Sequence, residues 1–152
     1  IGFTDYGQGV AEVHQFDQNN NQWNLLGDKF EGELTYGLLG SSISLNAVGD
    51  VIAISELLEN SRYNKPGYVK IFKYNGISWI QKGKSRRCKE TMDRFGKSIS
   101  INNAGNVIAI GADYELETVQ QPGIAGYVSV YTFNESKNDW ELKGQTLDGR
   151  LE

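Results

Sequence analysis

The sequence has very few cysteine, histidine and proline residues. Its 152 residues include one cysteine, one histidine and two prolines. The single cysteine, Cys88, cannot form a disulfide within the chain, so it does not mark a redox compartment. The single histidine, His14, has no second histidine or cysteine with which to complete a metal site or a nucleophile pair. We therefore expect no catalytic residue, no metal site and no cofactor, and the chain is not expected to be an enzyme.

Long apolar segments and an excess of positive charge are also missing. No apolar run approaches the roughly 18 residues that indicate a membrane span. The net charge is −4, whereas general nucleic-acid binding needs a basic surface. We expect neither a membrane span nor a nucleic-acid partner.

The sequence does contain an internal repeat. Tryptophan is followed four residues later by glycine three times, at Trp23/Gly27, Trp79/Gly83 and Trp140/Gly144, so that the tryptophans are 56 and then 61 residues apart. Segment 40–54, GSSISLNAVGDVIAI, matches segment 96–110, GKSISINNAGNVIAI, at 10 of 15 positions. Repetition at a nearly fixed period indicates that one structural unit is copied.

Each unit is predicted to form four β-strands, separated by turns rich in glycine, asparagine and aspartate. In the first complete unit we expect strands near 41–45, 51–55, 68–74 and 78–82. In the second we expect them near 97–101, 107–111, 127–133 and 140–145.

The segment VIAI, at 51–54 and again at 107–110, is apolar on both alternating faces of its strand. Such a strand must be covered on both sides, which requires neighbouring sheets. Four-stranded sheets stacked radially form a β-propeller. We therefore predict an all-β fold, a β-propeller segment of four-stranded antiparallel blades, with about two and a half blades of a larger ring present.

The whole chain, 1–152, is interpreted as part of one propeller domain. Ile1-Gly2 aligns with Ile110-Gly111, so residues 1–35 correspond to the second half of a blade. Residues 36–91 and 92–148 are complete blades, and 149–152 begin the next link. We interpret the chain as an excerpt of a longer ring, and expect it to aggregate, oligomerise or unfold readily when isolated, because apolar sheet faces are left without a neighbour.

The repeat also resembles a known family. The motifs are Phe95-Gly96, Ile110-Gly111-Ala112 and GYVSVY at 126–131, with the same frame at 39–40, 54–56 and 67–72. They resemble the FG-GAP repeat of integrin-α-like β-propellers over nearly the whole chain. Two features depart from the family pattern. The first copy has Leu39 where the second has Phe95, and Glu56 and Asp113 stand where the family often has proline.

The resemblance implies calcium in some blades, held by an Asp-x-Asp-x-Asp-Gly turn between the first two strands. Here the turns read NAVGD at 46–50 and NNAGN at 102–106, with at most one carboxylate each. Calcium needs six to eight oxygen ligands, several of them charged. The metal site of the family therefore does not carry over. A cation bridging Asp113, Glu115 and Glu117 is an alternative that requires an extended loop.

Basic residues collect in the link 82–90, at Lys82, Lys84, Arg86, Arg87 and Lys89. The equivalent link after Gly27 is acidic, so this charge is not copied. We predict that Arg86, Arg87 and Lys89 contact an anionic protein partner, beside the variable loops 56–66 and 112–125; the alternative is a merely solvated loop. Reversing the three charges is expected to weaken binding with little loss of stability.

Three other features have both a structural and a functional interpretation. The repeated tryptophans pack between blades or stack on sugars. His14 stands where Phe72 and Tyr131 stand in the other units, and is interpreted as a packing residue. Asn134 begins an Asn-Glu-Ser glycosylation sequence at a predicted hairpin tip. This sequence, together with the resemblance, favours an extracellular, cell-surface or luminal protein.

The function predicted from the sequence is a non-catalytic binding or assembly module with a protein partner. One alternative is a carbohydrate-binding propeller. Another is the accessory propeller of an enzyme whose catalytic domain lies outside the chain, which the resemblance allows because related propellers accompany hydrolases. Fold alone does not decide among these functions.

Overall fold

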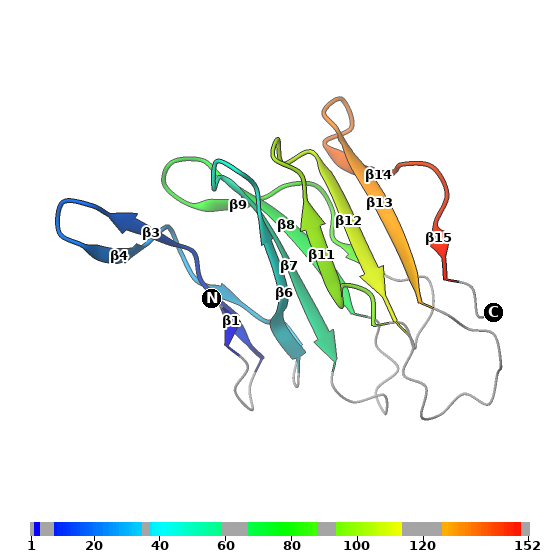
Figure 1. Ribbon diagram of the computed structural model, residues 1–152, viewed down its shortest axis with the longest axis horizontal. Helices are drawn as coiled ribbons and strands as arrows, with labels where there is room; N and C mark the ends of the chain where they lie inside the picture. The colour runs from blue at the N-terminus through cyan, green and yellow to red at the C-terminus, as the bar shows by residue number, and fades with distance from the viewer. Residues whose placement is uncertain are drawn as a thin grey trace.

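The computed structural model describes residues 2–3, 8–34, 37–58, 67–87, 94–113 and 126–149. Within these ranges every regular element is a β-strand, and neighbouring strands pair antiparallel (Figure 1). The predicted all-β, antiparallel fold is thereby confirmed at the level of strands and sheets. A membrane-crossing helix is not found in the described part of the chain.

The first complete unit forms one sheet. Strands β6 (Gly37–Leu45), β7 (Val51–Leu58) and β8 (Tyr68–Tyr74) lie side by side, and the fourth position is shared by β9 (Trp79–Gln81) and β10 (Arg86–Arg87). Both short strands pair with β8. The prediction that 82–90 is entirely a link was therefore wrong at Arg86–Arg87. Gly83, with a φ of +74°, lies between the two pieces, a conformation that glycine adopts readily.

The second complete unit repeats this arrangement. Its strands are β11 (Ser98–Ile101), β12 (Val107–Ala112), β13 (Tyr127–Asn134), β14 (Asp139–Leu142) and β15 (Leu147–Asp148). The order is β11-β12-β13-β14, and β15 also pairs with β13. The predicted strands lie within a few residues of the observed ones.

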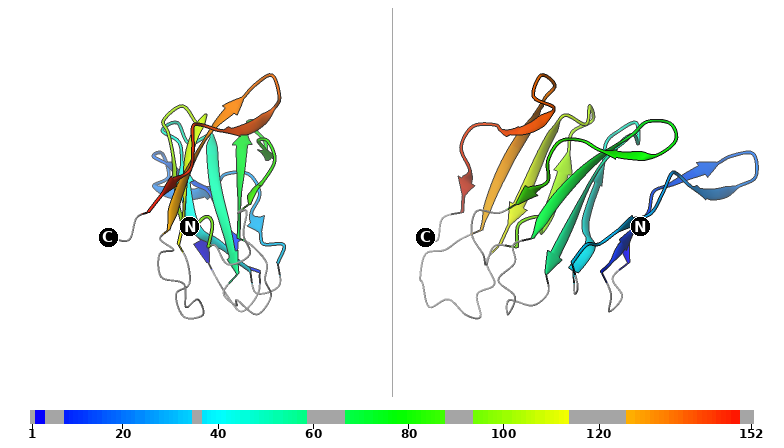
Figure 2. Two further views of the ribbon diagram at one scale, coloured as in Figure 1. Left: turned by 90° about the vertical axis from the view of Figure 1, so that its right-hand side faces the viewer. Right: turned by 180° about the vertical axis from the view of Figure 1, so that it is seen from behind.

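The N-terminal unit supplies shorter strands. β1 (Gly2–Phe3), β2 (Val10–Ala11) and β5 (Phe30–Glu31) form one small sheet, and β3 (His14–Asp17) pairs with β4 (Gln22–Leu25) as a hairpin. The three units stand in a row, with the β3–β4 hairpin at one end and β13 to β15 at the other (Figures 1 and 2).

The middle sheet is covered on both faces, as its sequence predicts. Ile52 and Ile54 pack in one cluster with residues of the N-terminal unit, including Val13 and Phe30. Val51 and Ala53 pack in a second cluster, whose other members come from both complete units: Val69, Ile71, Phe95, Ile101, Ile108, Ile110, Ala112 and Trp140. All four residues of the segment 51–54 are at most 2% exposed. Alternation of side chains along the strand sends them into two separate cores.

The turns between the first two strands are held by asparagine. Asn46 Oδ1 accepts hydrogen bonds from the backbone N–H groups of Asp50 and Val51, at 3.0 and 2.9 Å. Asn102 makes the same pair of contacts in the next unit, to residues 106 and 107, again at 3.0 and 2.9 Å. In the turn between the first two strands, both units thus have an amide side chain that is engaged with its own turn.

Candidate interaction surface

The repeated tryptophan contacts the glycine of the preceding unit. Trp79 Nε1 donates a hydrogen bond to the carbonyl oxygen of Leu26 at 2.7 Å. A β-carbon on Gly27 would lie 2.8 Å from Cδ1 of that indole, so the ring can approach only because residue 27 is glycine. Trp140 repeats both features, with the carbonyl of Lys82 at 2.7 Å and Gly83 beneath its ring. The Trp-x-x-x-Gly motif therefore joins neighbouring units, a pairing that the sequence analysis did not identify.

Arg86, one of the three residues predicted to contact a partner, is engaged within the chain. Its Nη2 lies 2.8 Å from Asp139 Oδ1, and its Nη1 donates to the Trp140 carbonyl at 2.8 Å. The guanidinium also lies 5.9 Å from the centroid of Tyr131. Arg86 joins β10 of one sheet to β13 and β14 of the next. For this residue the contacts favour the opposite expectation from that of the sequence analysis, namely that reversing its charge lowers stability.

Lys82 is likewise placed between the sheets. Its Nζ lies 4.4 Å from the ring centroid of Phe133 and donates to the carbonyl of Gly105 at 3.2 Å. Burial is the main cause that lowers the pKa of this ammonium below its usual value. Two of the five basic residues of the link thus stabilise the junction rather than facing solvent.

Arg87 and Lys84 have exposed side chains, so both charges of these residues face solvent. Arg87 lies in β10 with its guanidinium 5.4 Å from the ring centroid of Tyr68. The residues at the same register in the other units are Glu31 and Asp148, which carry the opposite charge. Lys89 lies outside the described residues.

A buried carboxylate that the sequence analysis assigned to a variable loop lies inside the fold. Glu56 is fully buried at the end of β7 and accepts hydrogen bonds from the backbone N–H groups of Glu33 and Leu34, at 3.2 and 2.9 Å. The Tyr68 hydroxyl also donates to it. Burial first, and then the Glu56 carboxylate, raise the pKa of Tyr68 far above its usual value. Glu56 thereby ties the N-terminal unit to the middle sheet. The signal in the sequence is a charged residue two positions after the apolar segment 51–54, followed by two further apolar residues.

The other acidic residues of the variable loops are only partly described. Asp113 forms a two-point ion pair with Arg94, with both N–O distances at 2.8 Å. Glu115 and Glu117, its suggested partners in a cation site, lie outside the described residues. Within the described ranges, no three acidic, histidine or cysteine side chains gather as a metal-ligand set.

Asn134 lies at the end of β13, where its side chain shapes the hairpin. Its Oδ1 accepts hydrogen bonds from Ser136 N at 3.0 Å and Ser136 Oγ at 2.7 Å. Its Nδ2 donates to Glu141 at 2.9 Å. Asn75 makes similar backbone contacts in the preceding unit, so this position has a structural role that the repeat shares. Glycosylation of Asn134 stays a prediction.

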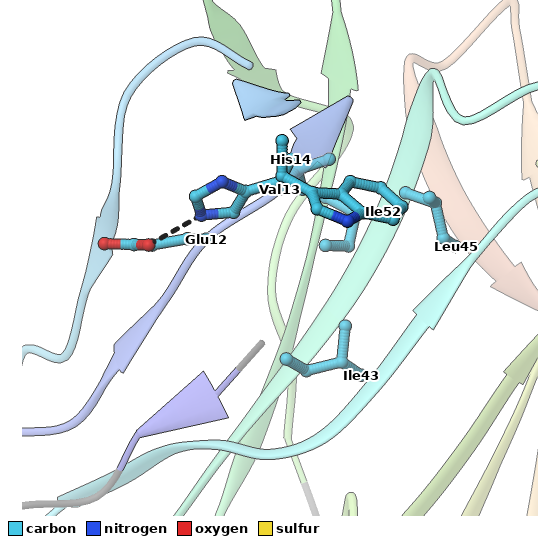
Figure 3. Close-up of a pocket in the computed structure, with 7 residues that line it drawn as sticks. Glu12, Val13, His14, Ile43, Leu45 and Ile52 are labelled. Atoms are coloured by element: carbon cyan, nitrogen blue, oxygen red, sulfur yellow. Dashed lines mark hydrogen bonds and ion pairs between the residues drawn. The ribbon is translucent and has the colours of Figure 1, made fainter. Parts of the chain in front are cut away.

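A groove of about 650 Å³ lies between β3 and the strands β6 and β7 (Figure 3). Its wall is mainly apolar and includes Trp23, Ile43, Leu45 and Ile52. His14 lines it with its Nε2 at 2.8 Å from Glu12, and Glu12 also pairs with Lys29 at 2.7 Å. The hydrogen bonds from Lys29 and His14 lower the pKa of Glu12. Trp23 is 66% exposed, whereas the equivalent Trp140 is 2% exposed.

The contacts described above separate the basic residues of the link 82–90 into two groups. Arg86 and Lys82 belong to the junction between two sheets, whereas Arg87 and Lys84 remain on the surface.

No protein-family model matches the chain, and none of the curated proteins compared with it matches either.

Proposed function

We propose that the chain is a β-propeller segment that serves as a non-catalytic binding or assembly module, with a protein as its partner. The observation that supports this proposal most is the same Trp–Gly contact at both junctions, with indole–carbonyl distances of 2.7 Å each. A contact that recurs between successive sheets suits a radial stack, and a radial stack of four-stranded sheets is a propeller.

The partner surface in this proposal is the exposed part of the basic link, with Arg87 at its centre together with Lys84; Lys89, the third residue predicted for this surface besides Arg86, lies outside the described residues. The copied residues are accounted for by packing and turns, so specificity belongs to residues that differ between units. Arg87 is exposed and replaces the acids Glu31 and Asp148 of the other units. A cationic surface of this kind favours an acidic partner. Arg86 is not part of it, because its guanidinium is engaged with Asp139 and Trp140.

The proposed compartment is extracellular, cell-surface or luminal, with Asn134 as the glycosylated residue. The carbohydrate-binding alternative has one observation in its favour, the exposed ring of Trp23 beside the apolar groove. Trp79 and Trp140 do not favour it, since both indoles donate to backbone carbonyls of a neighbouring unit.

The substitution Arg87→Glu tests the partner surface. Proteins captured by the wild-type chain and by the variant would be compared by quantitative mass spectrometry. We expect an acidic protein to be captured about fivefold less by the variant, which corresponds to the loss of roughly one surface charge interaction.

Lys97→Glu is the matched control, because it makes the same charge change at another exposed position. Its captured proteins should equal those of the wild type. If Arg87→Glu and Lys97→Glu lose the same proteins to the same extent, net charge explains the binding and the assigned surface is wrong.

A further inference from the structure

We propose that Asn75 is a site of spontaneous deamidation, at which the folded chain converts an asparagine side chain to aspartate or isoaspartate. Asn75 lies in the hairpin between β8 and β9 and is followed by Gly76. The hairpin belongs to the middle unit, which has a unit on either side of it (Figure 1). The inference goes beyond the proposed module function, because it concerns a covalent change at the end of β8 opposite to Arg87.

The reaction joins the side-chain amide to the backbone nitrogen of the next residue. The Gly76 nitrogen loses its proton to water or hydroxide and attacks Cγ of Asn75. A C–N bond forms, the Cγ–Nδ2 bond breaks, and Nδ2 takes up a proton and leaves as ammonia, which gives a five-membered succinimide ring. Water then adds to one of the two ring carbonyls and opens the ring, either to aspartate or to isoaspartate.

The attacking nitrogen is accessible in the structure. Asn75, Gly76 and Ile77 are all exposed. Gly76 has a φ of +98°, and nothing lies within 4 Å of the place where its β-carbon would be. Within the described ranges its N–H group donates no hydrogen bond. The nitrogen is therefore neither shielded by a side chain nor engaged by an acceptor.

The amide of Asn75 is polarised for attack. Its Oδ1 accepts hydrogen bonds from the backbone N–H groups of Ile77 and Ser78, at 2.9 Å each. Negative charge develops on this oxygen when the Gly76 nitrogen adds, and N–H groups aimed at such an oxygen stabilise the transition state. Nδ2, the leaving group, has no partner in the part of the chain that the structure describes.

Asn134 has the same place in the next hairpin but lacks two of these features. Backbone N–H groups also donate to its Oδ1, at 3.0 and 3.3 Å. Its Nδ2, however, donates to Glu141 at 2.9 Å, so this bond must break before ammonia can leave. The residue that follows it is Glu135, whose side chain crowds the attacking nitrogen. The sequence Asn-Gly occurs once in the chain, at Asn75.

The product changes a hairpin that carries one of the junction tryptophans. Aspartate at position 75 retains an oxygen that can accept from Ile77 and Ser78. Isoaspartate adds one carbon to the main chain before Gly76 and therefore shifts the hairpin. Trp79 pairs with Tyr74 at the base of this hairpin and donates to a carbonyl of the N-terminal unit. Isoaspartate is thus expected to loosen the junction between that unit and the middle sheet.

Incubation of the full chain near neutral pH and body temperature tests the proposal. Peptide mapping by mass spectrometry measures the acid formed at each asparagine, and labelling by an isoaspartate methyltransferase identifies the isomer. We expect Asn75 to be lost at least about tenfold faster than Asn134. The rate should rise with pH, since the Gly76 nitrogen must lose its proton. A synthetic peptide of residues 72–80 gives the rate of the same sequence outside the fold.

Two substitutions separate the sequence from the geometry. Glu135→Gly creates a second Asn-Gly pair in the next hairpin while Nδ2 of Asn134 still donates to Glu141. Asn134 in this variant should remain about threefold or more slower than Asn75. Adding Glu141→Ala releases Nδ2 and should remove most of the difference. Gly76→Ala should slow the loss of Asn75 about tenfold, because a methyl group then shields the nitrogen. Circular dichroism should show that each variant keeps the β fold.

Three results would overturn the proposal. The first is an Asn75 that stays intact in the folded chain while it is lost from the peptide. The second is a loss at Asn75 no faster than at Asn134. The third is a Glu135→Gly variant in which Asn134 reacts as fast as Asn75, since the amide nitrogen would then have no influence. The Arg87→Glu variant should deamidate like the wild type, so failure of this proposal and failure of the partner proposal give different results.

Discussion

At the scale of single residues, similar side chains have different roles because the neighbouring unit differs. Arg86 and Arg87 are adjacent, but the first is held by Asp139 and the Trp140 carbonyl while the second is exposed. Adjacent residues on a strand point to opposite faces, so only one of the two can reach the next sheet. The sequence shows the charges but not which face each one occupies.

This difference predicts unequal effects of the same substitution. Arg86→Glu places a carboxylate against Asp139 and leaves a carbonyl without its donor, so we expect a loss of about 1–3 kcal/mol in the free energy of unfolding. Arg87→Glu should change it by less than about 0.5 kcal/mol, since its side chain is exposed. Urea denaturation followed by circular dichroism measures both. Equal effects would show that Arg86 contributes no more than a surface charge.

At the scale of elements, neighbouring sheets are joined at the start of β14. Asp139 Oδ1 accepts hydrogen bonds from Lys84 N at 2.9 Å and from Arg86 Nη2 at 2.8 Å. Burial by itself raises the pKa of Asp139, but the N–H groups of Lys84 and Trp140, together with the Arg86 guanidinium, outweigh it and hold the pKa below its usual value. The ionised carboxylate therefore stabilises the folded state.

The sign of this shift predicts how stability depends on pH. Because the folded state has the lower pKa, the contribution of Asp139 is complete above the unfolded pKa, near 4, and is lost as pH falls through the folded pKa. The melting temperature of Asp139→Asn should thus lie below that of the wild type at neutral pH, and the gap should narrow below about pH 4. Asp148→Asn, an exposed control, should have the same melting temperature as the wild type. A gap that stays constant with pH would rule out the carboxylate as its cause.

The elements were easier to predict than the contacts between them. Alternation and turn residues located β7, β8, β12 and β13 within a few residues, because both signals are local. The split fourth strand was missed, since Gly83 looks like the end of a strand in sequence. The partner of each tryptophan was missed as well, because Trp140 and Lys82 are 58 residues apart and nothing local links them. Glu56 was misplaced for the same reason: its hydrogen-bond donors at 33 and 34 are distant in sequence.

At the scale of the whole molecule, the sheets are stabilised by one another. The core between the two complete units contains residues from both, among them Val51, Val69, Ile108 and Trp140. In repeat proteins such interfaces supply much of the stability, so weakening one of them should loosen the adjoining sheets.

Trp140→Ala tests this coupling. Removing a side chain that is 2% exposed should cost about 3–5 kcal/mol and should reduce amide hydrogen-exchange protection in β7 and β8 as well as in β12 and β13. Trp23→Ala should cost less than about 0.5 kcal/mol, because Trp23 is 66% exposed. If Trp140→Ala lowered protection in its own sheet alone, the two sheets would be energetically independent.

The direction of the Trp–Gly contact has a consequence for how this chain can change in evolution. Trp79 and Trp140 each meet the glycine of the unit before them, so the middle unit carries one half of two junctions, and the two junctions are built alike. Duplication or deletion of one whole period, 56 or 61 residues, would therefore join an intact tryptophan side to an intact glycine side at the new boundary. An insertion of half a period would leave one tryptophan without its glycine. Related genes should thus differ in length by whole units, and recombination within a strand should be rare among them.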